Sequence, residues 1–325
     1  MATLKFFNAI TQAIDEEMQR DERVFVVGED VGKWGGVWGT SQGLYNKYGP
    51  DRVLDTPISE AGIIGTAVGA AITGLRPIAE IMYIDFITCG MDQVVNQAAK
   101  LRLMSGNKLT LPMVIRMPEG CGTMEAAQHS QNLEAWFVHT PGLKVIAPYT
   151  VYDAKGLLKS AIRDDNPVIF IENRCLYGRK ENLPEDEWLV PIGKASVLKQ
   201  GRDITVISYS RMLDRVLQAA AQLENRISVE VIDLRTLVPM DIEAVSASVR
   251  KTGRCVVAHE APKRCGFGSE VVRVLTEMLF SELKAPPTVV GGADIPIPYS
   301  PVLEKACIPQ TKDVVEAIEK VCSAS

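Results

Sequence analysis

The sequence predicts an α/β protein with a parallel sheet covered by helices on both faces, followed by a second, smaller α/β domain. Segments typical of strands and helices alternate along the 325 residues. The predicted strands are continuous apolar runs, such as Val24-Phe-Val-Val27, without the alternation that marks a strand with one wet face. A charged, proline-containing stretch at 178–192 lacks any period. We therefore expect domains at 1–177 and 193–325, joined by a linker at 178–192.

The elements of the first domain follow from apolar periodicity. An amphipathic helix is expected over 4–20, and a loop rich in glycine and tryptophan over 31–43. Strands are expected at 24–27, 78–82, 112–117, 144–147 and 167–172, and helices at 61–75, 89–104, 129–139 and 151–163. In the second domain we expect strands at 203–208, 228–233, 254–258 and 288–291, and helices at 211–224, 241–249, 267–281 and 311–322.

One helix start carries an unusual acid. Glu60 follows Ser59, a typical N-cap residue, so its charge lies in the first turn, where the helix dipole favours it. The helix beyond it contains small and apolar residues with no further charge, which predicts burial on all sides. A carboxylate in such a solvent-excluded environment tends to have a raised pKa and is a candidate functional residue. The alternative is an ordinary helix-start acid that reaches solvent.

Other candidates stand at the carboxyl ends of predicted strands, where open α/β sheets bind ligands. His129, one of three histidines, suits proton transfer near neutral pH. Taken alone, it is at least as typical of a hydrogen-bonded core histidine or a neighbour of a helix cap. Phe86 either stacks on a flat heterocycle or fills the core. Glu29, Asp85 and Asp92 are acids in similar positions, each also typical of a cap or a solvated side chain.

Several common site motifs are absent from the sequence. The stretch Cys265-Gly-Phe-Gly-Ser269 has Val271 where a dinucleotide-binding turn requires its third glycine, and it begins too late after its strand. The chain also lacks a P-loop, an HExxH motif and a GxSxG motif. These absences argue against Rossmann-type dinucleotide binding, a P-loop nucleotide site, an HExxH zinc site and a GxSxG serine nucleophile.

The composition limits which classes of partner and which cellular compartment are expected. A net charge of -5 argues against nucleic acid or an anionic membrane as the main partner. The seven cysteines form no CxxC pair, which favours reduced thiols in the cytoplasm over disulfides or a zinc site. Acids occur too early in the chain for a targeting peptide, and no apolar run is long enough to span a bilayer.

A set of motifs distributed from the first helix to the last carries a family resemblance. They are GEDVG (28–32), DTPISEAG (55–62), DQVVNQAAKLRLMSG (92–106), AAQHSQNLEAWF (126–137), PGLKVIAP (141–148), DAKGLLKSAIRDDNPVIF (153–170) and PYSPVLEKACIPQ (298–310). On these motifs the chain resembles the beta subunits of the thiamine-diphosphate-dependent first component of 2-oxo acid dehydrogenase complexes, in the transketolase superfamily. The motifs are specific for the family and much less so for the substrate.

The resemblance implies the fold and the roles of particular residues. The expected domains are a pyrimidine-binding domain of thiamine enzymes and a transketolase C-terminal domain. Glu60 corresponds to the glutamate that hydrogen-bonds the aminopyrimidine ring of thiamine diphosphate, and Phe86 to the aromatic residue that packs on it. His129 corresponds to a histidine implicated in acyl transfer to the lipoyl group. Glu29 and Asp92 correspond to acids that line a tunnel between two active sites. Potassium ligands in some relatives correspond to Met113, Ala161, Ile162, Asp164 and Asn166.

The resemblance also implies partners. The chain lacks the GDG motif, followed by an asparagine pair, with which thiamine enzymes hold magnesium and the diphosphate. In the family an alpha subunit supplies that half of the site in an α2β2 heterotetramer, so this chain alone is expected to be incomplete. Further expected partners are the peripheral subunit-binding and lipoyl domains of a dihydrolipoyl acyltransferase.

The substrate stays open at the level of the sequence. The segment before His129 carries Glu119, Cys121, Met124 and Glu125, where relatives have small residues without acids. Pyruvate or acetoin is the expected substrate, and a branched-chain 2-oxo acid is the alternative. A non-catalytic scaffold is the alternative of another class, opposed by the presence of both Glu60 and His129. A self-sufficient transketolase-type enzyme is opposed by the chain length and the absent diphosphate motif.

Overall fold

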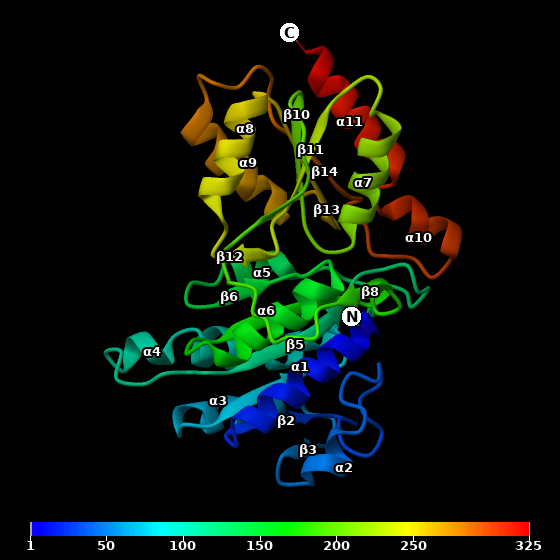
Figure 1. Cartoon of the computed structure of the whole chain (residues 1–325). Coiled ribbons are helices and arrows are strands. Elements are labelled where there is room, and N and C mark those ends of the chain that lie inside the picture. The colour runs from blue at the N-terminus through cyan, green and yellow to red at the C-terminus, as the bar shows by residue number, and fades with distance from the viewer. Residues whose placement is uncertain (1, 325) are drawn as a thin grey trace. The chain divides into compact units, whose positions relative to one another are not determined.

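The computed structural model describes residues 2–324, which form two compact units. The first unit contains the chain up to Glu119 together with Trp136–Ile192, and the second contains Gly120–Ala135 together with the chain from Gly193 onward. Each unit is an α/β structure around its own sheet (Figure 1). The segment 120–135 lies in the sequence between strands of the first unit but has its contacts in the second.

The sheet of the first unit is parallel and deeply buried. Its strands β2 (Val24–Gly28), β3 (Val53–Asp55), β4 (Arg76–Glu80), β5 (Val114–Glu119), β6 (Lys144–Ile146) and β7 (Val168–Asn173) lie in the order β6-β7-β5-β4-β2-β3. Every residue of β2, β5 and β7 is buried. Strands covered on both faces account for the apolar runs without alternation.

Helices cover this sheet through apolar stripes. The helix α1 (Phe6–Arg20) buries Phe6, Ile10 and Ile14 at helical spacing and packs against α6 (Val151–Arg163). The amines of Lys155 and Lys159, both buried, reach the carboxylate of Glu16 at 2.6 and 2.7 Å. The remaining helices of this unit are α2 (Leu44–Tyr48), α3 (Glu60–Ile72) and α4 (Leu101–Met104), with α5 (Glu134–Val138) beginning in the segment 120–135.

Three predicted elements differ from the structure. The first helix begins at Phe6, because residues 2–5 form β1 (Ala2–Lys5) and pair with β8 (Lys180–Leu183). The helix expected over 89–104 is divided into the 3-10 helix η1 (Ile84–Gly90), the π-helix η2 (Gln93–Ala98) and α4. The helix expected from His129 begins only at Glu134, since residues 129–133 are irregular.

The stretch 178–192, expected to be a linker, is part of the first unit. The strand β8 follows the 3-10 helix η3 (Arg174–Leu176), and beyond β8 the indole of Trp188 stacks on the ring of Tyr152 at 5.0 Å. A Cβ on Gly156 would lie 2.6 Å from Val190 and 2.8 Å from Trp188, so the glycine allows this close contact. The local lack of periodicity therefore reflects an extended segment that packs on α6.

The second unit matches its predicted pattern closely. Its sheet has the order β14-β13-β10-β11-β9, formed by β9 (Ser196–Lys199), β10 (Ile204–Ser208), β11 (Val229–Asp233), β13 (Cys255–Pro262) and β14 (Thr288–Gly292). The helices α8 (Ile242–Thr252) and α9 (Phe267–Leu279) cover one face, and α7 (Met212–Gln222) and α11 (Thr311–Ser323) cover the other (Figure 1). The strands β9 and β12 (Thr236–Val238) and the helix α10 (Pro301–Cys307) were not predicted. Among the described residues, no helix is both long and apolar enough to span a bilayer.

Candidate functional site

The carboxyl ends of three neighbouring strands bring together most of the predicted site residues of the first unit. Gly28 on β2 is in register with Asp55 on β3 and with Glu80 on β4. Glu29 directly follows the first of these residues, Glu60 begins the helix after the second, and Phe86 lies in η1 after the third. Parallel strands end at the same edge of a sheet, so this edge is the candidate site.

Glu60 begins α3 and is half-buried. The hydroxyl of Ser59 accepts a hydrogen bond from the amide of Gly62 at 3.3 Å, which confirms the predicted N-cap. The prediction that the helix is buried all round was wrong for this chain. Ile63, Ile64, Ala67, Val68 and Ala71 are buried, but the face with Gly62 and Thr66 is exposed. An all-apolar helix sequence cannot distinguish burial inside one chain from burial against another.

Glu29 lies close enough to Glu60 for their charges to interact. Burial is the main cause of the raised pKa of Glu29, and the negative charges of Asp30 and Glu60 raise it further. Asp92 stands at the start of η2, which packs against α3, and its side chain is exposed. Its carboxylate accepts a hydrogen bond from the Asn96 amide at 2.7 Å.

A cluster of aromatic rings supports Phe86 from within the first unit. The ring of Tyr83 meets that of Phe86 edge to face at 5.6 Å, and the indole of Trp38 meets Tyr83 at the same distance. The guanidinium of Arg174 lies 5.0 Å from the centre of the Tyr83 ring. The indole of Trp38 donates to the carbonyl of Met82 at 3.2 Å. The loop over 31–43 therefore packs beneath the candidate site, a role that its glycine and tryptophan content alone did not indicate.

A buried ion network joins the strands below the same edge. The guanidinium of Arg116, on β5, hydrogen-bonds both oxygens of Glu172 at 2.9 and 2.7 Å and also contacts the carboxylate of Glu80. The three side chains are no more than 5% exposed. The hydroxyl of Tyr177 donates to Glu172 at 2.8 Å, and Arg116 donates to the hydroxyl of Thr40 at 3.1 Å. The sequence signal for this network was a charge within each apolar strand, which the sequence analysis did not use.

The residues predicted to bind potassium gather where α6 leads into β7. One guanidinium nitrogen of Arg76 donates to the carbonyls of Ile162 and Asp164, at 2.9 and 3.1 Å. The carboxylate of Asp164 accepts from the Asn166 side chain at 2.8 Å and contacts the amine of Lys144. The other two predicted ligands accept backbone bonds, the Met113 carbonyl from Val168 and the Ala161 carbonyl from Asp164. Each of these oxygens already accepts a hydrogen bond or contacts a cation of the protein, and the role of the five residues as potassium ligands stays a prediction.

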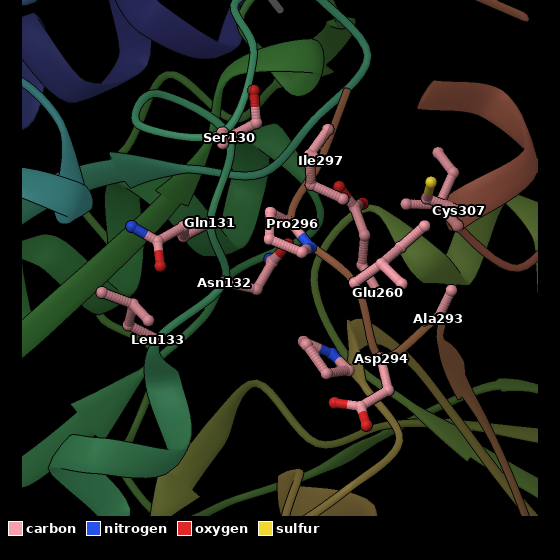
Figure 2. A pocket seen from close by; sticks show the side chains of 15 residues that line it. Ser130, Gln131, Asn132, Leu133, Glu260, Ala293, Asp294, Pro296, Ile297 and Cys307 are labelled. Carbon is pink, nitrogen blue, oxygen red and sulfur yellow. The ribbon is translucent and has the colours of Figure 1, made fainter. Parts of the chain in front are cut away.

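His129 lies in the segment 120–135 of the second unit and is partly exposed. Its backbone amide points to the carbonyl of Ala126 at 3.4 Å. Residues on both sides of it line a cavity of about 300 Å³ with Glu260, the 292–297 stretch and Cys307 (Figure 2).

The four unusual residues before His129 have different surroundings. Glu119 is 2% and Cys121 1% exposed, whereas Glu125 is half-buried and Met124 is 48% exposed. Burial, assisted by the nearby charge of Glu260, raises the pKa of the Cys121 thiol. Cys121 is thus an inert buried thiol at this position and not a reactive one.

Known proteins provide the remaining comparison. Residues 2–180 match the family described as the transketolase pyrimidine binding domain, and residues 193–314 match the transketolase C-terminal domain. The chain is 47% identical to the pyruvate dehydrogenase E1 component subunit beta of Porphyra purpurea, over 100% of this chain and 98% of the relative. It is 49% identical to the mitochondrial counterpart of Rattus norvegicus, over 96% of this chain and 89% of the relative.

The fold is shared with a solved structure. A split-gene transketolase, described as an inactive beta4 tetramer, matches with a TM-score of 0.83 and 26% identity over 99% of both chains. The predicted α/β fold of the transketolase type, with its two domains in that order, is therefore confirmed.

Proposed function

Because the chain belongs to the family of pyruvate dehydrogenase E1 beta subunits, we propose that it binds the aminopyrimidine half of thiamine diphosphate and works in the oxidative decarboxylation of pyruvate. The observation that carries this proposal is the arrangement of Glu29, Glu60 and Phe86 at one edge of the parallel sheet.

The chemistry of this edge fits one half of the cofactor. A carboxylate at a helix start can hydrogen-bond a ring nitrogen, and a supported phenyl ring can pack on the pyrimidine plane. Glu29, Asp55 and Glu60, all acids, stand at or just beyond the strand ends, where a diphosphate would meet like charge. We therefore assign magnesium and the diphosphate to an alpha subunit. The electron sink for decarboxylation is supplied by thiamine diphosphate when it is bound.

The residues of this chain then have distinct tasks. Glu60 shares a proton with the pyrimidine ring, and cover by a second chain over the exposed face of α3 would exclude water from that contact. Phe86 orients the ring, and Glu29 and Asp92 line the path between the two active sites of the assembly. His129 moves a proton during acyl transfer to the lipoyl group. Potassium, if bound near Asp164, would have to displace the contacts of Arg76.

The assembly follows from the incomplete site. We propose an α2β2 heterotetramer that delivers acyl groups to the lipoyl domain of a dihydrolipoyl acyltransferase. The exposed face of α3 supports this, since Gly69 lacks a side chain and has open space beside it, which would allow a helix of the alpha subunit to approach closely, whereas Gly65 faces Gln93 of this chain.

Steady-state turnover of the alpha–beta complex, purified through a tag on this chain, tests the proposed function. An artificial electron acceptor would report on pyruvate, 2-oxobutyrate, three branched-chain 2-oxo acids, 2-oxoglutarate and acetoin. We expect kcat/KM for pyruvate to exceed that for the branched-chain acids by about ten-fold or more, the discrimination that extra methylene groups allow. A preference for a branched-chain acid would contradict the substrate assignment, and cofactor binding without turnover would favour the scaffold.

A further inference from the structure

The loop that carries His129 is held by buried carboxylates of the C-terminal unit. Glu304, on α10, is 3% exposed. One of its oxygens accepts hydrogen bonds from the backbone amides of Gly122 at 2.6 Å and of Met124 at 3.3 Å. The second oxygen also accepts from Met124 at 3.3 Å. Carboxylates bound by backbone amides form charge-assisted hydrogen bonds, which are the stronger class in proteins.

A second carboxylate holds the residue next to this contact. The side chain of Glu260, on β13, is 8% exposed and accepts from the backbone amide of Cys121 at 2.9 Å. The guanidinium of Arg211 donates to the carbonyl of Cys121 at 2.6 Å and lies 3.9 Å from Glu260. Both backbone groups of Cys121 are thereby fixed.

The backbone between these contacts and His129 is strained. Met124 and Ala126 have φ angles of 60° and 61°, in the left-handed region that residues with a Cβ rarely adopt. Such conformations persist where the surroundings determine them, and the two carboxylates supply those surroundings.

The loop is also anchored after His129. The hydroxyl of Tyr209 donates to the carboxylate of Glu134 at 2.6 Å, and both side chains are buried. Between Met124 and Glu134 the loop lines the cavity of about 300 Å³ (Figure 2), and there the carbonyl of Gln131 accepts from the amide of Gly120 at 3.2 Å. The anchors at the two ends of the loop therefore contribute to the position of His129, together with the contacts that the loop makes within itself.

We propose that Glu304 and Glu260 are positioning residues for His129. They bind backbone amides of its loop and thereby set where the imidazole meets the acyl acceptor. This inference rests on the proposed function for the role of His129, whereas the ordering of the loop does not depend on it. In this arrangement the C-terminal unit acts in acyl transfer through two carboxylates that bind the backbone of the His129 loop.

The test uses the alpha–beta complex with Glu304→Gln, because glutamine lacks the negative charge that strengthens the bonds to Gly122 and Met124 and places an NH₂ group where the second oxygen accepts from Met124. Glu260→Gln is the second variant, in case the first fails to fold. Glu230→Gln is the matched control, since Glu230 is a 2% exposed carboxylate of the same unit that accepts from the amide of Gly201 at 3.1 Å and does not touch the loop.

Two readouts separate positioning from a general structural role. Hydrogen exchange by mass spectrometry follows the peptide 127–131, which contains His129 but none of the three anchored amides. Loss of a hydrogen bond to a buried carboxylate should speed its exchange about ten-fold or more in Glu304→Gln. We also expect the ratio of lipoyl-domain acylation to acceptor-coupled decarboxylation to fall about ten-fold. His129→Ala should lower the same ratio, and Glu230→Gln should change neither readout.

The remaining outcomes would contradict either the ordering of the loop, the positioning of His129 or the proposed function. Unchanged exchange in both loop variants would mean that the carboxylates do not order the loop. Faster exchange with equal losses in both partial reactions would mean that they order it without positioning His129 for acyl transfer. If the wild-type complex turned over no 2-oxo acid, the proposed function would fail, while the exchange rates would still decide the ordering.

Discussion

Removal of the Arg116 guanidinium tests whether the buried ion network holds the strands beneath the candidate site. Arg116→Met keeps a similar apolar volume but leaves the carboxylates of Glu80 and Glu172, which are 5% and 0% exposed, without their shared cation. Breaking a buried ion pair on one side costs about 3–5 kcal/mol, because an uncompensated charge stays in a medium of low dielectric constant. A loss of that size should lower the melting temperature by on the order of 10 °C.

The loss should depend on pH with a defined sign. Burial raises the pKa of Glu80, and the positive charge of Arg116 opposes that rise. Without the guanidinium the folded-state pKa of Glu80 rises further above its unfolded value. The folded variant then binds more protons than the unfolded chain, so its stability falls as the pH increases through that folded-state pKa. We expect a larger deficit at pH 8 than at pH 5.5.

Urea denaturation followed by tryptophan fluorescence measures this loss at both pH values. The matched control is Arg273→Met, the same substitution at a 51% exposed arginine that pairs with Glu270 and Glu277 on a helix surface. That variant should change the free energy of unfolding by less than about 0.5–1 kcal/mol. Equal effects of the two substitutions, or a deficit that shrinks toward pH 8, would refute the reasoning.

Two further predictions concern backbone fit and acid stability. Gly142 has a φ of 106°, and a Cβ there would lie 2.1 Å from the carbonyl of Ala99. By the same urea denaturation, Gly142→Ala should lower the free energy of unfolding by more than about 2 kcal/mol. The control Gly106→Ala, at a φ of 66° with open space, should lower it by about 1 kcal/mol. Equal costs would show that the contact with Ala99 is relieved. Burial lowers the pKa of His259 to about 4. In the unfolded chain this imidazole has its ordinary pKa of about 6.5, so between pH 6.5 and 4 the unfolded chain binds a proton that the folded protein does not. The free energy of unfolding of the wild type should therefore decrease by about 3 kcal/mol over that range. In calorimetry the stability of His259→Asn should fall less steeply with decreasing pH than that of the wild type. An equal pH dependence in the two proteins would exclude His259 as the cause.

The fold was predictable where one apolar stripe or run specifies one element. The helix α6 has the bounds expected from its sequence, since its apolar spacing and the Thr150 cap both define it. The strand β3 was missed because it has three residues of which only Val53 is buried, and β8 because its partner β1 lies at the other end of the first unit's sequence. The start of α5 was misjudged because contacts with Glu260 and Glu304, more than a hundred residues later, hold the preceding loop in an irregular form.

The candidate site was predictable to a similar degree. Glu29, Glu60 and Phe86 could be assigned to one edge because parallel strands end together. The supporting side chains could not, since Trp38, Arg116 and Arg174 are brought to that edge only by the tertiary fold. Burial of Glu60 was overestimated because the exposed face of α3 has the composition of a buried one.

The most direct test of the account measures exchange of the thiazolium proton of thiamine diphosphate bound to the alpha–beta complex, by NMR after rapid quenching. The account predicts that Glu60→Gln slows this exchange by about 100-fold or more, within the range ascribed to a positioned acid–base group, while the cofactor stays bound. Asp55→Asn is the control, because Asp55 is an exposed acid at the same sheet edge whose carboxylate accepts from Gly32 at 2.9 Å. Its exchange rate should equal that of the wild type. A wild-type rate in Glu60→Gln would contradict the assignment of Glu60 and, with it, the proposed pyrimidine site.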